Sequence, residues 1–380
     1  MLGVFRGNGP CFIKKDRTGF EVNPESWHEN ANMIFIDQPV GAGYSYGSRT
    51  ARNTPDAMSE LYDALQIWLS SPHFSKFVGR PFGVWTESYG GHYGPGLVDH
   101  ILTMNVKLTS SSQKGRVVIP VQSLALGNAL INAREQFLGY LTFAESNPYN
   151  QTLVPPEAIK IAYKHFYQPN SGCYDSIKTC QATLDPYKCR HASSYCATKV
   201  FAVLAGDRNV YDVREDDSNP YPPNLTPVLN DSKFKASMGV PSTVQWVQCN
   251  DDIDEEFESS GDWMRDYSKQ LERIINSGVR TLLYAGDADF RVNYQGMEKL
   301  VDSLKLDDSK SLVNQNFTNW YIGEEKAGIY KTASTFTYLR LFGAGHEVPA
   351  YATGNLPRGR AAKAFFDQII SNMTITSLKA

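Results

Sequence analysis

A serine lies in a short glycine-rich segment, residues 85–93, which reads W-T-E-S-Y-G-G-H-Y between an apolar run and a helical pattern. On a tight turn between a strand and a helix, Ser88 could act as a nucleophile, because the first N–H groups of the helix would face a developing oxyanion. The common form of this turn is G-x-S-x-G; Thr86 replaces the first glycine and Gly90 supplies the second. A buried serine at a glycine-rich helix start would give the same local pattern, so the segment alone leaves both interpretations open.

Two later segments contain the partners that a nucleophilic serine needs. Asp287 and Asp289 directly follow an apolar run, and His346 lies in a glycine loop after another such run. The chain order Ser, Asp, His, with each residue at the carboxyl end of a strand, is typical of the α/β-hydrolase fold. In that arrangement Ser88 attacks a carbonyl, His346 takes and returns its proton, and an aspartate fixes the imidazole tautomer. The glycine clusters do not match G-x-G-x-x-G, so we expect no dinucleotide cofactor.

Short apolar runs alternate with helical patterns along most of the chain, which predicts a mostly parallel sheet flanked by helices. We expect strands at 33–36, 82–85, 123–128 and 281–285, and one that ends near Leu341. We expect helices from Thr54 (as N-cap) through Leu69, from the serine turn through Leu102, and over 262–276, 295–304 and 357–370. Residues 131–250 break this rhythm. We therefore predict an α/β-hydrolase core formed by 1–130 and 251–380, with 131–250 as an irregular cap insertion.

The bulk composition excludes several classes of protein. The 380 residues include 37 Lys and Arg against 40 Asp and Glu, and this near balance argues against a nucleic-acid-binding protein. No apolar run approaches the ~20 residues that a membrane span requires, and no secretory signal is visible after Met1. Residues 251–256 form an acidic run without the glycine of a calcium loop, so we expect a solvated loop there and no metal site.

Four of the six cysteines fall in one stretch, with separations of 7, 9 and 7 residues: Cys173, Cys180, Cys189 and Cys196. This symmetric spacing suits two nested disulfides, Cys173–Cys196 around Cys180–Cys189, although four cysteines allow three pairings and a zinc site is the competing interpretation. Five N-x-S/T sequons support the same oxidising environment: Asn150, Asn224, Asn230, Asn316 and Asn372. We therefore expect the protein to be secreted or to reside in the vacuolar lumen.

Further motifs are spread over nearly the whole chain. They are N-P-E-S-W at 23–27, I-D-Q-P-V-G-A-G-Y-S-Y at 36–46, E-S-Y-G-G-H-Y at 87–93, G-N at 127–128, G-D-W-M at 261–264 and G-H-E-V-P at 345–349. Together they resemble the serine carboxypeptidase family, in particular its fungal members related to carboxypeptidase Y. The cysteine spacing also matches the nested disulfide pair of that family. The resemblance implies an enzyme that releases C-terminal amino acids from peptides and proteins, with no cofactor.

The resemblance also implies a role for individual residues. Ser88 would be the nucleophile, Asp289 rather than Asp287 the acid of the triad, and His346 the base. The backbone N–H of Tyr89 would be one oxyanion donor. Glu87 would help to hold the C-terminal carboxylate of the substrate, which requires a shared proton because two like charges raise one pKa. Peptide cleavage is therefore expected to be favoured at acidic pH.

Some parts of the family pattern are missing. The family has an Asn-Gly-Gly-Pro-Gly-Cys-Ser-Ser segment, with the second oxyanion N–H, where this chain begins at Met1. Gly7 replaces the usual glutamate of Glu-Asn-Gly-Pro, Val292 replaces a family cysteine near the triad, and Cys249 matches a cysteine whose family partner is absent. We hypothesise that the chain is truncated at its N-terminus and expect an exposed sheet edge.

Two alternative functions remain open. Losing one oxyanion donor typically costs on the order of 10²–10³ in rate, so the chain could be a catalytically impaired homologue that binds peptides. An acyltransferase on the same scaffold, with an alcohol in place of water as acceptor, would use the same triad.

Overall fold

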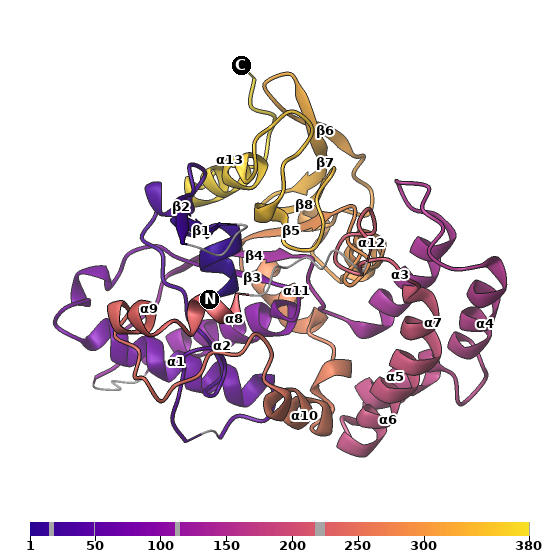
Figure 1. The fold of residues 1–380 in the computed structure, drawn as a ribbon, viewed down its shortest axis with the longest axis horizontal. Helices are drawn as coiled ribbons and strands as arrows, with labels where there is room; N and C mark the ends of the chain where they lie inside the picture. Colours follow the sequence, from indigo (N-terminus) through magenta and orange to yellow (C-terminus); the bar gives the residue numbers. More distant parts are fainter. Residues whose placement is uncertain (15–18, 49, 111–114, 217–224, 380) are drawn as a thin grey trace.

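A central sheet organises the molecule (Figure 1), whose computed structural model describes residues 1–14, 19–48, 50–110, 115–216 and 225–379. Within these residues the sheet has six strands in the order β3-β4-β5-β8-β7-β6. The first four pair in parallel: β3 (Phe82–Glu87), β4 (Val121–Gly127), β5 (Arg280–Gly286) and β8 (Phe336–Leu341). Two antiparallel strands follow, β7 (Glu325–Ala333) and β6 (Thr318–Ile322). The predicted mostly parallel sheet is confirmed.

Helices cover both faces of this sheet, because successive side chains of a strand point to opposite faces. Leu124 and Leu126 of β4 face one core, and Ala125 between them faces the other. The first core includes residues of α1 (Thr54–Ser70), α2 (Gly90–Ser110), α3 (Ala133–Glu145), α11 (Ser268–Asn276) and α12 (Tyr294–Ser303). The second includes residues of α13 (Arg360–Ile370), which Figure 1 shows on the opposite side of the sheet from α1 and α2.

The chain between β4 and β5 is largely helical. After α3 it forms α4 (Pro156–Phe166), α5 (Cys173–Thr183), α6 (Pro186–Cys196) and α7 (Ala202–Ala205), which lie together on the right of Figure 1. Three helices follow: α8 (Thr226–Leu229), α9 (Ser232–Ser237) and α10 (Asp251–Ser259). The irregular character expected for residues 131–250 is therefore wrong, because short helices that depend on tertiary packing and cross-links give weak periodic patterns.

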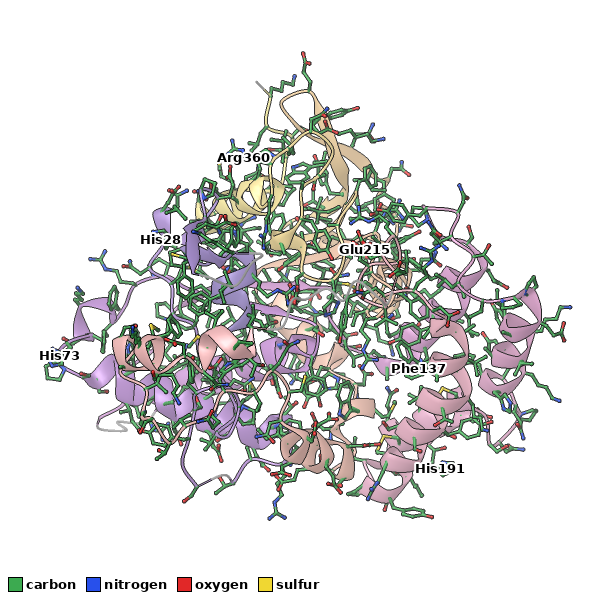
Figure 2. All side chains as sticks on the ribbon, viewed as in Figure 1. His28, His73, Phe137, His191, Glu215 and Arg360 are labelled. Carbon is green, nitrogen blue, oxygen red and sulfur yellow. A yellow bond between two sulfur atoms is a disulfide. The ribbon has the colours of Figure 1, made fainter. Side chains whose placement is uncertain are left out.

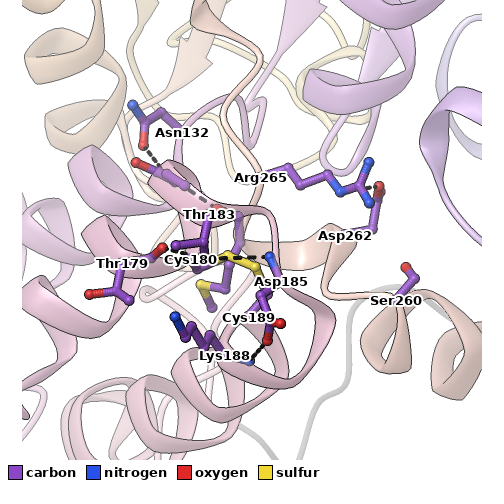
Figure 3. Close-up of a disulfide and its surroundings, with 12 residues drawn as sticks. Asn132, Thr179, Cys180, Thr183, Asp185, Lys188, Cys189, Ser260, Asp262 and Arg265 are labelled. Atoms are coloured by element: carbon purple, nitrogen blue, oxygen red, sulfur yellow. Dashed lines mark hydrogen bonds and ion pairs between the residues drawn. A yellow bond between two sulfur atoms is a disulfide. The ribbon is translucent and has the colours of Figure 1, made fainter.

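Two disulfides join α5 to α6 in the nested arrangement that the spacing suggested. Cys173 bonds to Cys196 and Cys180 bonds to Cys189, with Cα–Cα distances of 5.0 and 4.6 Å. Figure 3 shows the surroundings of the Cys180–Cys189 pair. All four side chains are buried. The zinc interpretation of these cysteines is wrong, because a disulfide sulfur is not available as a thiolate ligand.

The sheet is open on its β3 side. Residues 33–36 do not form the buried strand that their apolar character predicts: Ile34 and Ile36 keep 39% and 42% of their surface exposed. An apolar run becomes a strand only where a neighbouring strand supplies the other half of the hydrogen-bond ladder. In the described residues β3 pairs with β4 alone, so the expected exposed edge is present. A small hairpin, β1 (Cys11–Ile13) with β2 (Phe20–Val22), forms a separate sheet.

Three local expectations differ from the structure in detail. Asn53 rather than Thr54 caps α1, and its side chain accepts from the Asp56 N–H at 3.0 Å. Residues 251–256 lie in α10 instead of a loop, because the Asn250 side chain caps this helix and acidic groups are favourable near a helix N-terminus. The helix expected over 262–276 is interrupted: residues 262–264 form a 3₁₀ turn before α11 begins. None of the helices in the described ranges is long and apolar enough to cross a membrane.

Candidate active site

Ser88 lies on the turn between β3 and α2 with φ = 63°, a left-handed backbone conformation that is strained for a residue with a side chain. Its N–H donates to the Gly127 carbonyl at 3.0 Å, and its own carbonyl accepts from Gly91 N at 3.0 Å and from Leu130 N at 2.9 Å. A Cβ at Gly91 would come within 2.4 Å of Leu130 backbone atoms, so this position requires glycine. The turn that carries Ser88 is therefore held by backbone hydrogen bonds to the last residue of β4 and to the segment that follows it.

Thr86 fits where the common motif has glycine. Its hydroxyl donates to the Gly90 carbonyl at 2.8 Å, across the turn that presents Ser88. A Cβ at Gly90 would lie 2.5 Å from the Thr86 Cβ, so threonine at one position requires glycine at the other. The departure from G-x-S-x-G is compensated within the turn.

Asp289 and His346 are in direct contact, as the sequence predicted. The distance from His346 Nδ1 to Asp289 Oδ2 is 2.8 Å, and both side chains are buried. The same carboxylate oxygen accepts from Asn128 Nδ2 at 2.8 Å and from the Val292 N–H at 3.1 Å. These donors stabilise the charged carboxylate and hold it in one orientation.

Asp287 has a different environment from Asp289, two residues away. Its Oδ1 accepts from the Tyr149 hydroxyl at 2.5 Å and from the Gly343 N–H at 2.9 Å. Burial raises the pKa of Asp287 to about 6, although these two hydrogen bonds lower it. The structure thus brings Asp289, and not Asp287, to His346.

The carboxylate of Asp289 sets the ionisation of the histidine. Burial alone would lower the pKa of His346, but the charge and hydrogen bond of Asp289, with the nearby charges of Glu87 and Glu347, raise it to about 9. Because Nδ1 faces Asp289, Nε2 is the ring nitrogen left to exchange a proton with another group. Of the other histidines, His28, His73 and His191 are exposed and lie at the periphery of the molecule (Figure 2).

Glu87, the last residue of β3, lies in a region of opposing charges. Burial and the charge of Glu347 raise its pKa to about 8, while His346 and Arg6 act to lower it. The Arg6 guanidinium forms two hydrogen bonds with the Glu347 carboxylate, one of them at 3.0 Å. The side chains of Glu87, Arg6 and Glu347 line a pocket of about 1120 Å³ that extends along the open β3 edge, past Trp85. The pocket borders the site, but Ser88 and His346 are not among its lining residues.

A buried aspartate fixes Tyr89, the residue that follows Ser88. The Asp262 carboxylate accepts from the Tyr89 hydroxyl at 2.5 Å and from the Thr54 N–H and hydroxyl at 3.1 and 2.5 Å. His92 Nδ1 lies 3.6 Å from the same group. Burial alone would raise the pKa of Asp262, but His92, Thr54 and Tyr89 together lower it to about 2. The Tyr89 ring also packs against the Trp263 ring, with 4.7 Å between the ring centroids.

Two contributors to the site were not assigned a role from the sequence. Asn128 and Asp262 belong to motifs that carried the resemblance, but their hydrogen bonds to Asp289 and Tyr89 span 161 and 173 residues. The one local signal for Asn128 is its position directly after an apolar strand, as for Asp287 and Asp289.

The described residues contain no group of three or more His, Cys, Asp or Glu side chains placed to hold a metal ion. Cys11 is half-buried and Cys249 is exposed, and neither forms a disulfide.

The sequons differ in their surroundings. Asn150, Asn316 and Asn372 are exposed. Asn230 uses both ends of its amide: Nδ2 donates to the Trp246 carbonyl and Oδ1 accepts from the Trp246 N–H, each at 2.8 Å. Asn224 lies outside the described residues.

The comparisons with known proteins agree with this geometry. The family model described as serine carboxypeptidase matches residues 1–371. The chain belongs to the serine carboxypeptidase family. Carboxypeptidase S1 of Penicillium janthinellum is 30% identical over 383 residues, which cover 99% of this chain and 86% of that protein. Carboxypeptidase Y of Saccharomyces cerevisiae is 32% identical over 363 residues, which cover 92% of this chain and 64% of that protein. The chain thus spans less than two thirds of the length of this carboxypeptidase Y.

The solved structure of a carboxypeptidase superposes on this chain and confirms the fold. Kex1(delta)p, a prohormone-processing carboxypeptidase from Saccharomyces cerevisiae, superposes with a TM-score of 0.78 over 98% of this chain and 80% of that one, at 20% identity. The predicted α/β-hydrolase fold and the resemblance to serine carboxypeptidases are both confirmed. Family membership favours the peptidase interpretation over the impaired-homologue and acyltransferase alternatives.

Proposed function

We propose that this chain carries the active site of a serine-type carboxypeptidase that removes C-terminal amino acids from peptides through an acyl-enzyme on Ser88. The observation that carries the proposal is the 2.8 Å contact between His346 and Asp289, in a fold where Ser88 lies on a nucleophile elbow. His346 Nε2 takes the Ser88 proton as the hydroxyl attacks the scissile carbonyl. The same nitrogen then protonates the leaving amine, and water releases the acyl group by the reverse sequence.

The developing oxyanion requires preorganised N–H donors. We assign one of them to the backbone N–H of Tyr89, at the start of the turn into α2. The Asp262 carboxylate supports this assignment, because it holds the Tyr89 side chain through a 2.5 Å hydrogen bond. Holding the side chain limits the orientations open to the adjacent peptide.

Glu87 suits the recognition of a substrate carboxylate. At acidic pH its raised pKa of about 8 keeps it protonated, so it can donate a hydrogen bond to a carboxylate without repelling it. Acidic pH has the opposite effect on catalysis by His346, because the pKa of this histidine is also raised and the base must be neutral to accept a proton. We therefore expect KM to rise as Glu87 ionises above about pH 8, and kcat to fall as His346 takes up a proton below about pH 9.

The direct test compares a blocked dipeptide that has a free C-terminus with its C-terminal amide. The proposal predicts release of the terminal amino acid from the acid, slower cleavage of the amide, and no cleavage of either by Ser88→Ala. Equal rates on both substrates would contradict a carboxypeptidase but not a hydrolase. Transfer to an added alcohol in place of hydrolysis would instead favour the acyltransferase.

We further propose that the protein functions in an oxidising compartment, either outside the cell or in the vacuolar lumen. The two buried disulfides between α5 and α6 support this, because such bonds persist where thiols are not kept reduced. The exposed sequons Asn150, Asn316 and Asn372 are compatible with glycosylation there. Mobility on a gel before and after glycosidase treatment of the native protein tests the second point.

A further inference from the structure

A short segment of the helical insertion, as we call the chain between β4 and β5, contacts both the loop that carries Asp289 and the loop that carries His346. This bridging segment, residues 209–214, follows α7. The Val210 carbonyl accepts from the N–H groups of Phe290 and Arg291 at 3.0 and 2.8 Å. The Tyr211 carbonyl accepts from the His346 N–H at 2.9 Å. The segment therefore lies against the loop that follows β5 and the loop that follows β8.

Arg214 ends the bridging segment and reaches the base loop with its side chain. Its Nη1 donates to the Gly343 carbonyl at 2.9 Å. The other side of the guanidinium forms a bidentate pair with Asp212: Nε donates to Oδ1 at 2.8 Å and Nη2 to Oδ2 at 2.6 Å. Asp212 is buried, so this pair fixes the guanidinium plane, and the ring of Tyr149 lies 5.5 Å from its centre.

Gly343 is held on both sides of its backbone. Arg214 binds its carbonyl, and the buried Asp287 carboxylate accepts from its N–H at 2.9 Å. The Tyr149 hydroxyl, donating to the same Asp287 oxygen at 2.5 Å, ties that carboxylate to the helical insertion. Gly343 has φ = 70° and stands three residues before His346. These contacts limit the conformations open to the loop that carries the base.

We propose that Arg214 is a positioning residue, which with Asp212 and Asp287 fixes Gly343 and so holds His346 in register with Asp289. This inference rests on the proposed function, since it assigns His346 the role of base. A local structural role alone would be met by any side chain that fills the same space. Positioning requires the guanidinium fork, because only a planar group with several donors can bind Asp212 and the Gly343 carbonyl at once.

The main test is Arg214→Met, which keeps much of the side-chain volume and removes every donor. Displacing a catalytic group by about 1 Å can cost about 10²-fold in rate, so we expect kcat to fall about 10- to 100-fold while KM changes less than about threefold. The kcat of Arg214→Lys, which keeps the charge but loses the planar guanidinium fork, should lie between those of the wild type and Arg214→Met. The matched control is Arg273→Met: Arg273 forms a similar bidentate pair with Asp99, at 2.9 and 2.7 Å, between α11 and α2.

A second readout does not depend on turnover. The proton shared by His346 Nδ1 and Asp289 should give a resolved low-field proton NMR signal in the wild type and in Arg273→Met. That signal should broaden or shift in Arg214→Met. If Arg214→Met does not fold, Tyr149→Phe takes its place, because it removes a single hydroxyl from Asp287 and should change the signal in the same way.

The two readouts separate the failure of each claim. A kcat in Arg214→Met within about threefold of that in Arg273→Met, or an unchanged NMR signal, would overturn the positioning role. If the wild type hydrolyses no C-terminal acid substrate, the proposed function fails, and the positioning role is then decided by the NMR signal alone.

Discussion

Replacing Asp289 by asparagine should reduce catalysis without disturbing the histidine tautomer. Asp289 Oδ2 accepts from His346, Asn128 and Val292, whereas Oδ1 is buried and has no hydrogen-bond partner in the described part of the chain. An asparagine amide can satisfy the three donors only by placing its oxygen at the Oδ2 position. His346 Nδ1–H then still has an acceptor, so the variant loses the charge but keeps the geometry.

The expected loss follows from the pKa of His346. The Asp289 carboxylate is the largest factor that raises this pKa to about 9, against an ordinary value near 6.5. A rise in the pKa of His346 from about 6.5 to about 9 corresponds to roughly 3 kcal/mol of imidazolium stabilisation, or about 10²–10³-fold in rate if the transition state carries the full charge. A wrong tautomer would cost about 10⁴-fold instead. Asp289→Asn also places an amide NH₂ at the buried Oδ1 position, which should cost about 1–3 kcal/mol of stability.

The assay measures kcat/KM for a blocked dipeptide together with the free energy of unfolding in urea. Asp99→Asn is the control, since it removes a carboxylate that pairs with Arg273 on the surface. We expect Asp289→Asn to lower kcat/KM by about 10²–10³ and to move the acid limb of the kcat profile to lower pH. A loss of less than about tenfold would refute the role of Asp289. A loss of 10⁴ or more would refute the claim that Asn128 and Val292 fix the amide orientation.

Three further variants test the energetics of the site and the insertion. The pKa of Asp262 is lowered to about 2 in the folded state, so its charge contributes about 2 kcal/mol of stability above pH 4, which is lost as pH falls from about 4 to 2. Asp262→Asn should lack this pH dependence when the free energy of unfolding in urea is measured at pH 6 and pH 3. The same change in unfolding free energy between the two pH values in both proteins would contradict this prediction. The pKa of Glu87 is raised to about 8, so the folded state holds one more proton than the unfolded state and loses stability as pH rises from about 4.5 to 8. Glu87→Gln should therefore become more stable relative to wild type over that range. A constant difference in unfolding free energy between the two proteins would count against the raised pKa. The Cys173–Cys196 bond joins cysteines with a sequence separation of 23, so replacing both by serine should lower the free energy of unfolding in urea by about 3 kcal/mol. A loss below about 1 kcal/mol would show that the helical packing suffices.

The sequence predicted that Ser88, Asp289 and His346 follow strands, because strand ends are local features. Each of these residues follows an apolar run that forms one of the strands β3, β5 and β8, and parallel strands bring their carboxyl ends to one edge. Residues alone did not distinguish Asp287 from Asp289, since both follow β5. The distinction depends on Tyr149 and Gly343, which lie 138 and 56 residues from Asp287.

Other features depend on long-range packing that no local pattern records. Residues 33–36 have the composition of a buried strand, but in the described part of the chain they pair with no strand and instead line the pocket along β3 through Met33, Ile34 and Phe35. The bridging segment is a further example: its residues bind loops that lie between 75 and 135 positions away in the chain. The strands β6 and β7 were not predicted, because polar residues interrupt their apolar ones: β6 reads T-N-W-Y-I and β7 reads E-K-A-G-I-Y-K-T-A, so neither contains a long apolar run.

The most direct test of the active-site assignment is the covalent labelling of the intact protein by a fluorophosphonate, with the modified residue located by peptide mass spectrometry. A serine activated by His346 and Asp289 should give one adduct per chain, on Ser88. Labelling should be abolished in Ser88→Ala and slowed at least about 100-fold in His346→Ala. An adduct on another residue, or labelling of Ser88 at the same rate without His346, would contradict the account.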